Sequence, residues 1–459
     1  MRGSGDGVVN TATANSPLEE LQNQFAIIDM TGEIRFIDTL KIDDILRGQS
    51  LEDPAFYKKH DATLLMKRAL ETLPYPCKPE VVINNFLVSP ATLFYQGTAF
   101  TPKKMPPEIL NFWVPPTVEA VPGNCSALTD FIRDIICNGG TEHFEYLMNF
   151  LAHMVQKPEE KPGVMIVLLG GQGTGKGVFF RILKAIWSRT CLLVSDINQV
   201  IGQFNACLEN NFVICFDEAL FAGDRKSLDR LKSLVTEPHI RIEQKYQPAR
   251  SIESVHRFFA ASNHGHFAHV EHDDRRFAFF KVSDSKQQNT EYFRTIVAAI
   301  NDSSVMSALM HELKNRDLIN FDVRKKPSGA EHIKQKIKSL QGFDRYWFEV
   351  LGSADLAADG GFEHSVASPW LDSKFVPTSK LLRHYKDYNK NAQRFEPFQS
   401  SELAARLQRL CPSAICDRKT SEVYGQAASR QQRGYELPTL ATARAEFEGF
   451  IGGKMQWDE

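Results

Sequence analysis

The sequence has no long hydrophobic run, no cysteine pairs at metal-binding spacing and no secretory signal. Its longest uninterrupted apolar run, 164–169, is far too short to cross a bilayer. The 8 cysteines lack the C-x-x-C spacing of zinc sites, and half of them lie in apolar segments, where cysteine usually acts as a small buried hydrophobic residue. We therefore expect a soluble protein of a reducing cytoplasm, without a structural zinc site.

An excess of charge of one sign is also missing. The 54 lysine and arginine residues nearly balance 56 aspartate and glutamate residues, which gives a net charge of -2. This balance excludes a uniformly basic protein that coats nucleic acid, although a local basic module remains possible. A length of 459 residues with 42% hydrophobic residues predicts several globular units and excludes a wholly disordered chain.

Composition and periodicity divide the chain into six segments. Residues 25–38 alternate around a glycine-containing turn and predict a β-hairpin, and the remaining stretch up to about residue 120 predicts short strands joined by loops. Apolar residues recur every three or four positions over 126–156, which predicts two helices broken at 138–140. The predicted segments are a flexible tail at 1–20, a mixed strand and loop region at 21–124, a helical collar at 125–160, an α/β domain at 161–340, a helix and linker at 341–372, and a winged-helix-like domain at 373–459.

The α/β segment alternates apolar strands with helical patterns. Such alternation predicts an α/β fold with a largely parallel central sheet flanked by helices. Helical stretches are also expected over 291–313 and 331–351. The predicted strands are 164–169, 191–194, 212–216, 258–261 and 277–282.

A glycine-rich turn after the first of these strands carries the strongest functional signal. Glycines let backbone N–H groups point at phosphate oxygens, the next helix adds its positive N-terminal end, and Lys176 supplies a mobile charge for the β- and γ-phosphates. Gly177 stands where a Ser or Thr hydroxyl usually ligates Mg²⁺, so either water and carboxylates hold the metal or hydrolysis is impaired. The predicted nucleotide-binding residues are Gly170, Gly171, Gln172, Gly173, Thr174, Gly175, Lys176 and Gly177.

Polar residues that follow later strands complete the expected catalytic site. Asp217 would orient the Mg²⁺ shell and Glu218 would activate the attacking water, although an acid pair after a strand is more often a helix cap. Asn263 would position the lytic water, or it is simply a turn former. Arg275 and Arg276 would supply an arginine finger to a neighbouring subunit, unless they form a surface ion-pair cluster with the adjacent aspartates.

Two basic regions predict contact with nucleic acid. Residues 240–252 alternate on both sides of Pro248, which predicts a projecting hairpin with Lys245 and Arg250 near its tip. In a ring of subunits such tips would converge on DNA, and an ordinary charged hairpin is the alternative. Residues 374–435 carry twelve basic and five acidic residues, and their two helices followed by a basic two-stranded flap are typical of a winged-helix module. A solvated charged face is the alternative there.

Together these motifs resemble those of superfamily 3 helicases, and in particular the helicase part of phage, plasmid and poxvirus-type primase–helicases. The resemblance runs over roughly residues 85–457, and within this family a glycine after the motif lysine is ordinary. The stretches that carry it are 147–158, 170–177, 216–218, 231–232, the hairpin with Lys245, 261–263, 274–276, 433–438 and Trp457.

The resemblance implies an AAA+-like ATPase core, usually assembled as a hexameric ring that translocates on single-stranded DNA. It implies ATP and Mg²⁺ as cofactors, single-stranded or forked DNA and possibly a primase or polymerase as partners, and the host cytoplasm as location. The Walker A, Walker B, sensor and arginine-finger roles would fall on Lys176, on Asp217 with Glu218, on Asn263, and on Arg275 or Arg276, and Lys245 would be the DNA-contacting lysine of the hairpin.

The leading hypothesis is an ATP-dependent DNA helicase that serves replication of a phage or other mobile element. One alternative is a DNA-binding replication initiator or packaging ATPase that uses ATP as an assembly switch without unwinding. Another is a small-molecule kinase, which needs neither a basic hairpin nor a distant arginine pair. Residues 1–120 lack the paired acids and zinc cysteines of a primase, so we expect a helicase-only protein or a fragment, with no primer synthesis.

Overall fold

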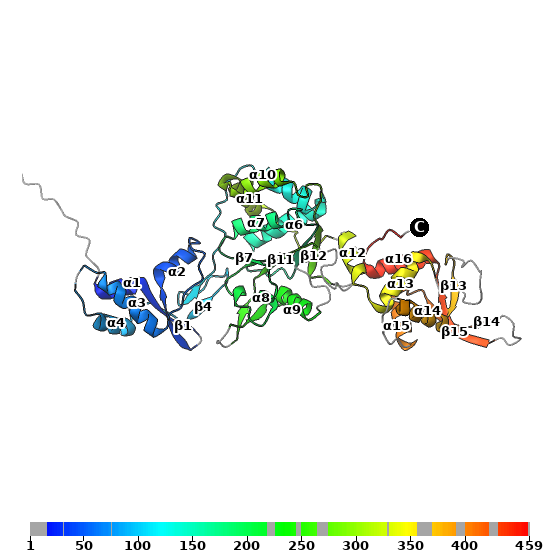
Figure 1. Ribbon diagram of the computed structural model, residues 1–459, viewed down its shortest axis with the longest axis horizontal. Helices are drawn as coiled ribbons and strands as arrows, with labels where there is room; N and C mark the ends of the chain where they lie inside the picture. Colours follow the sequence, from blue (N-terminus) through cyan, green and yellow to red (C-terminus); the bar gives the residue numbers. More distant parts are fainter. Residues whose placement is uncertain are drawn as a thin grey trace, which may run out of the picture.

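The chain folds into three bodies arranged in a row. In the computed structural model, an N-terminal body, a central α/β body and a C-terminal body follow one another along the longest axis (Figure 1). Within the described ranges, no helix is long and apolar enough to traverse a lipid bilayer. The structure describes residues 16–30, 32–74, 76–217, 225–244, 249–263, 274–327, 330–355, 370–391, 400–421 and 430–457.

A small sheet forms the centre of the N-terminal body. Strands β1 (Phe25–Met30) and β2 (Glu33–Asp38) pair antiparallel, which confirms the predicted hairpin, and β3 (Phe94–Tyr95) joins β1 in parallel. Successive β1 residues enter apolar clusters on opposite faces of this sheet, as a strand buried on both faces requires. The body also contains α1 (Pro17–Gln24), α2 (Thr39–Leu46), α3 (Lys59–Glu71), α4 (Pro79–Val88), β4 (Gly97–Ala99) and β5 (Ile109–Asn111).

The prediction of strands and loops up to residue 120 is wrong for much of this body. Helices α2, α3 and α4 occupy that stretch, and α1 begins at Pro17, inside the predicted flexible tail. Helix α3 buries Ala62, Met66 and Leu70, which share one face at four-residue spacing. This stripe is short and mixed with other apolar residues, so packing against β2 and α4 decides the helix more than local pattern does.

In the chain, the helical collar follows the N-terminal body and precedes the first strand of the main sheet. Helix α5 (Ser126–Asp130) continues into a π-helical turn (Phe131–Ile136), and α6 (Thr141–Gln156) follows. Asn138 and Gly139 separate them with φ values of 50° and 72°, a left-handed turn that stops the first helix. The predicted break at 138–140 is therefore confirmed.

A parallel sheet of five strands is the centre of the molecule. Its order is β12-β6-β11-β8-β7, and each neighbouring pair is parallel. The predicted α/β fold with a parallel sheet is thus confirmed. The strands are β6 (Met165–Leu169), β7 (Cys191–Val194), β8 (Val213–Phe216), β11 (Arg257–Ser262) and β12 (Phe277–Lys281).

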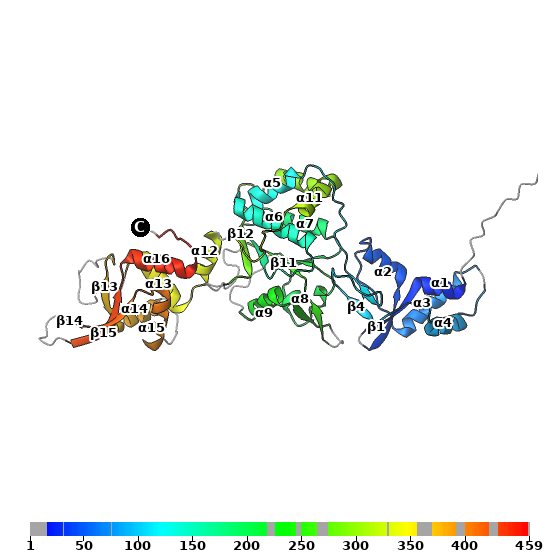
Figure 2. The same cartoon turned by 180° about the vertical axis from the view of Figure 1, so that it is seen from behind.

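Helices cover both faces of this sheet (Figures 1 and 2). Along β6, Ile166 and Leu168 pack under α6, α7 and α11, whereas Val167 and Leu169 pack under α8 and α9 on the other face. Because both faces are buried, the strands read as continuous apolar runs, which is why they could be recognised in the sequence. The elements around the sheet are α7 (Lys176–Ile186), α8 (Asn198–Ile201), α9 (Arg225–Thr236), the hairpin β9 (His239–Ile242) and β10 (Arg250–Glu253), α10 (Thr290–Asn301) and α11 (Ser303–Asn315).

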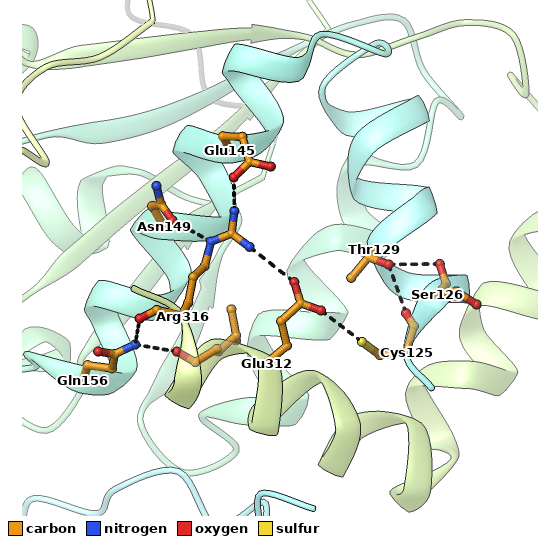
Figure 3. Close-up of polar contacts among 9 residues, drawn as sticks. Cys125, Ser126, Thr129, Glu145, Asn149, Gln156, Glu312 and Arg316 are labelled. Carbon is orange, nitrogen blue, oxygen red and sulfur yellow. Dashed lines mark hydrogen bonds and ion pairs between the residues drawn. The ribbon is translucent and has the colours of Figure 1, made fainter. Parts of the chain in front are cut away.

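A polar network ties the collar to α11. Arg316 Nε donates to Asn149 Oδ1 at 2.5 Å, and its other two nitrogens reach the carboxylates of Glu145 and Glu312 (Figure 3). Gln156 Nε2 donates to the carbonyl of Arg316 and to one of the last carbonyls of α11, each at 2.8 Å. These bonds satisfy carbonyls that a helix end leaves without internal partners, and they fix α6 against α11.

The C-terminal body combines helices with a three-stranded antiparallel sheet of order β13-β15-β14. Strands β14 and β15 pair antiparallel, so the predicted two-stranded flap is present. The predicted helical stretch at 331–351 is two helices, and Tyr346 and Trp347 of the second pack into the apolar core of this body. Its elements are α12 (Ala330–Ser339), α13 (Gly342–Ser353), β13 (Lys374–Pro377), α14 (Thr378–Asn391), α15 (Ser400–Leu410), β14 (Ile415–Ser421), β15 (Arg430–Leu437) and α16 (Leu440–Ile451).

Candidate functional site

The glycine-rich loop connects β6 to α7 at the carboxyl edge of the parallel sheet. Strand β6 ends at Leu169 and α7 begins at Lys176, as the sequence predicts. Gly173 and Gly175 adopt φ values of 75° and 100°, a backbone region that L side chains rarely enter. The loop thereby turns sharply enough to direct the N-terminal N–H groups of α7 toward the cleft beside it.

Lys176 is buried and bends back over the loop. Its ammonium donates to the carbonyl oxygens of Gly170 and Gly171 at 2.7 Å each, and it lies 3.4 Å from Thr174 Oγ1. Thr174 Oγ1 in turn donates to the Gly171 carbonyl at 2.9 Å. A cation is therefore held at the mouth of the loop, where it can swing toward an anion in the cleft.

A cleft of about 810 Å³ brings three of the predicted residues together. Lys176 lines it from the loop, Asp217 from the end of β8 and Asn263 from the end of β11. Both Asp217 and Asn263 have exposed side chains, and the Asp217 N–H donates to the Val194 carbonyl at 3.0 Å, which fixes the strand end. The parallel sheet explains the convergence, because the carboxyl ends of its strands meet at one edge. Glu218 and Lys245 lie outside the described residues.

The opposite wall of the cleft comes from α10 and the turn before it, which the sequence did not indicate as part of the site. Its lining side chains include Thr290, Phe293, Arg294 and Val297. In the sequence these residues follow the pattern of an ordinary amphipathic helix. Their place in the wall of the cleft follows from the packing of α10 beside α7. Arg181 on α7 also lines the cleft.

The turn before α10 is bonded to the glycine-rich loop. Gln287 Nε2 donates to the Gln172 carbonyl at 2.8 Å, and the Gln288 N–H donates to the Gly173 carbonyl at 3.0 Å. Gln288 has a φ of 59°, an unfavourable value for a residue with a Cβ. The glycine-rich loop is thus fixed by the turn between β12 and α10, in addition to its connections to β6 and α7.

Asp274 directly precedes the two predicted finger arginines in the chain, and its side chain is buried. Its buried carboxylate accepts from the Arg276 N–H at 2.8 Å and lies 3.7 Å from the Arg276 guanidinium and 3.9 Å from the Lys232 ammonium. Lys326 donates to the Asp274 carbonyl at 2.9 Å, and burial lowers the pKa of Lys326 to about 8. Arg275 is exposed, and among the described residues it has no ion-pair partner. Neither arginine lines this chain's own cleft.

Arg250 stands at the loop end of the hairpin, near the tip as predicted, but its guanidinium is engaged by a carboxylate of the same chain. Arg250 begins β10, where it pairs in register with Ile242, and its guanidinium forms an ion pair with the carboxylate of Glu209. The antiparallel pairing of β9 with β10 confirms the hairpin itself. Because a carboxylate of the same chain engages it, Arg250 is a weaker candidate for DNA contact than the sequence suggested.

Buried polar residues connect this hairpin to β11. Ser254 Oγ lies 2.9 Å from His256 Nδ1, and Lys161 donates to Ser254 Oγ at 2.5 Å and to the Glu237 carbonyl at 2.6 Å. The neighbouring Arg257 donates to backbone carbonyls of the 157–160 turn. Burial lowers the pKa of Lys161 to about 7, that of His256 to about 4 and that of Arg257 to about 9. These hydrogen bonds tie the 157–161 turn to the segment that leads from the hairpin into β11.

Comparison with known proteins finds similarity in this part of the chain. A family of unknown function, DUF5906, matches residues 168–276, a range that includes Lys176, Asp217, Asn263 and the arginine pair. The DNA primase-polymerase of Nitratiruptor phage NrS-1 is 30% identical over 217 residues, which are 44% of this chain and 29% of that protein. The chain therefore matches less than a third of the length of this relative.

Solved structures of the NrS-1 C-terminal region are similar to nearly the whole chain. One apo structure has a TM-score of 0.61 at 17% identity and covers 92% of this chain and 99% of that one. A second, an A form apo structure, has a TM-score of 0.62 at 15% identity, with coverages of 91% and 98%. At this level of identity the likeness concerns the fold, a mixed α/β arrangement built on the five-stranded parallel sheet.

Proposed function

We propose that this chain is an ATP-driven DNA helicase that acts in the replication of a phage or other mobile element. The observation that carries the proposal is the cleft in which Lys176, Asp217 and Asn263 meet beside a glycine-rich loop. A cation, a carboxylate and an amide around a helix N-terminus suit a nucleoside triphosphate with its metal. The similarity to a phage DNA primase-polymerase supports the replication context.

In this proposal each cleft residue acts on the triphosphate. The loop N–H groups bind the phosphates, and Lys176 leaves its carbonyl partners to neutralise the β- and γ-phosphates. Asp217 would hold Mg²⁺ together with water and phosphate oxygens, since Gly177 has no hydroxyl to offer, and the ion would offset the charge that develops on the phosphates. Glu218 would take a proton from the attacking water, and Asn263 would orient that water.

The finger role falls on Arg275 in preference to Arg276. Asp274 holds the Arg276 guanidinium in the same chain, whereas the Arg275 side chain is exposed and does not line this chain's own cleft. An exposed arginine of this kind fits a shared site, in which Arg275 enters the cleft of a neighbouring copy. A ring of copies, such as a hexamer, would place an arginine in each cleft.

The DNA contacts would come from two places. Lys245 stands in the sequence between β9 and β10 and would contact a single strand in the ring. The C-terminal order α13-β13-α14-α15-β14-β15, with a β13-β15-β14 sheet, supports a winged-helix module that contacts DNA. Because the phage relative is a DNA primase-polymerase, the proposal also includes a primase or polymerase as a partner.

The decisive experiment measures ATP hydrolysis by the purified chain with and without single-stranded DNA, together with separation of a forked duplex. We expect turnover that rises with the single strand and disappears in Lys176→Ala, whereas Lys104→Ala, an exposed lysine outside the cleft, keeps it. Turnover that is indifferent to DNA in a solitary chain would contradict the proposal. DNA-stimulated turnover without strand separation would favour the initiator or packaging ATPase instead.

A further inference from the structure

The helix that precedes the wing offers little positive charge to DNA. In winged-helix and related modules this helix usually enters the major groove, and here it is α15. Its inner face packs Leu403, Leu407 and Leu410 into the core. Its exposed side includes Glu402 and Gln408, an acid and a neutral amide.

The two arginines of α15 are engaged within the C-terminal body. Arg406 Nη1 donates to Asp344 Oδ1 at 3.2 Å and Arg409 Nη2 donates to Asp344 Oδ2 at 2.6 Å, so both guanidinium groups share one carboxylate on α13. The Arg409 guanidinium also lies over the ring of Phe450, 5.1 Å from its centroid. The Asp344 carboxylate thus offsets part of the positive charge that these two arginines would offer to DNA phosphates.

The wing formed by β14 and β15 is arranged differently. Arg418 and Arg433 stand directly opposite each other in the antiparallel register, so their side chains share one face of the ribbon, and both are exposed. The other described side chains of that face are Cys416, Gln431 and Tyr435, none of them acidic. Arg433 Nε donates to Cys416 Sγ at 3.4 Å, and within the described ranges the Arg433 guanidinium has no carboxylate partner. Two like charges directly opposite each other cost stability unless an anion lies between or beside them.

The other face of the same ribbon is already neutralised. Lys419 Nζ donates to Glu436 Oε2 at 2.5 Å and lies over the ring of Phe375, 5.4 Å from its centroid. Among the described side chains, the wing thus has one face with paired charge and one face whose positive charge meets no carboxylate. The second face is the one on which an anionic polymer would gain counterion release.

We propose that the wing face carrying Arg418 and Arg433, and not helix α15, contacts the phosphate backbone of duplex DNA. The inference rests on the DNA contact proposed for this module and names the surface that makes it. A two-stranded ribbon is narrow enough to lie along a groove, and two arginines on one face can reach phosphates or the negative potential of a narrow minor groove. The ATP cleft takes no part in this contact.

The test measures binding of the full chain to a fluorescent 20-base-pair duplex, without nucleotide, over a series of salt concentrations. Arg418→Ala and Arg433→Ala should each weaken binding roughly tenfold, and each should reduce the slope of log affinity against log salt by about 0.9. Lys419→Ala removes the same charge from the opposite face and should change both quantities far less. Gln408→Ala on α15 should leave both unchanged. Thermal stability should not fall in the arginine variants, because their side chains are exposed and each substitution removes one of two directly opposed like charges.

The outcomes separate the inference from the function it rests on. If the parent chain binds duplex and the two arginine variants bind equally well, the wing assignment is wrong while the DNA contact stands. Equal losses in Lys419→Ala and Arg418→Ala would likewise overturn it, since general electrostatics would then explain binding. If the arginine variants bind the duplex normally but lose binding to one of its single strands, measured in parallel, the wing contacts that strand and the duplex contact is refuted. A parent chain that binds no DNA refutes both.

Discussion

Phe293 packs directly against Gly175, so closely that a Cβ on the glycine would come 2.6 Å from Phe293 Cε1. This contact joins the glycine-rich loop to α10, which forms the opposite wall of the cleft. Phe293 also meets Phe131 of the collar edge-on at 6.4 Å between ring centroids. The loop conformation is therefore supported by the collar and by α10, two elements distant from it in sequence.

Gly175→Ala should abolish nucleotide binding. The added methyl would collide with Phe293, and the φ of 100° is strained for alanine. Gly449→Ala, in α16 and outside the cleft, is the matched control, because a Cβ there meets nothing within 4 Å and should leave binding intact. Binding of a fluorescent ATP analogue by both variants checks the prediction, and equal binding by the two would contradict it.

Alanine substitutions of Arg275 and Arg276 should have different effects on ATP turnover and on stability. Arg275→Ala should lose ATP turnover with unchanged thermal stability, because its side chain is exposed and makes no ion pair among the described residues. Arg276→Ala should lower the free energy of unfolding by about 1–2 kcal/mol, since the buried Asp274 carboxylate loses a cation.

Mixing tests whether Arg275 acts in a neighbouring copy. Arg275→Ala and Lys176→Ala proteins, each inactive alone, should recover part of the turnover when combined, because some interfaces then contain an intact cleft and an intact arginine. No recovery, in a mixture shown to associate, would count against a shared site.

The hairpin residues should also differ. Lys245→Ala should reduce stimulation of ATP turnover by single-stranded DNA at least several-fold, whereas basal turnover stays near the parent value. Arg250→Ala should reduce stability, because Arg250 pairs with Glu209, and it should change stimulation less. Turnover assays over a DNA titration, combined with thermal unfolding, distinguish the two expectations. The reverse order of effects would indicate that Arg250 leaves Glu209 to bind DNA.

Acid should destabilise the fold through buried histidines. Burial lowers the pKa of His256 to about 4 from an ordinary value near 6.5, so between these pH values the unfolded chain takes up a proton that the folded chain does not. The stabilising contribution is complete above pH 6.5 and is lost as the pH falls toward 4. His256→Gln should reduce the slope of unfolding free energy against pH by about 1.4 kcal/mol per pH unit near pH 5.

A second histidine gives an internal comparison for this experiment. Burial also lowers the pKa of His153 to about 4, so His256→Gln should keep part of the acid sensitivity and the double variant with His153→Gln should keep less. Urea unfolding at pH 7.5 and at pH 5 measures these slopes. An unchanged slope in the double variant would show that other groups cause the acid loss.

In the central body, the local sequence pattern was sufficient to predict the strands of the sheet and three residues of the cleft. The strands could be predicted because burial on both faces makes each of them an unbroken apolar run.

The site residues Lys176, Asp217 and Asn263 could be predicted because each follows a strand of the parallel sheet, directly or after the glycine-rich loop. The N-terminal helices were missed because stripes such as Ala62, Met66 and Leu70 are short, and their helical state depends on packing against neighbours.

Residue type and spacing along the chain were enough to predict the α/β class, the glycine-rich loop and the cluster of polar strand ends. Three features became visible only once the chain was folded: α10 forms a wall of the cleft, Asp274 holds Arg276 while Arg275 stays exposed, and Glu209 engages Arg250. Each of these depends on segments far apart in sequence meeting in space. Periodicity describes which face of an element is apolar, and it carries no information about which distant charge that face will meet.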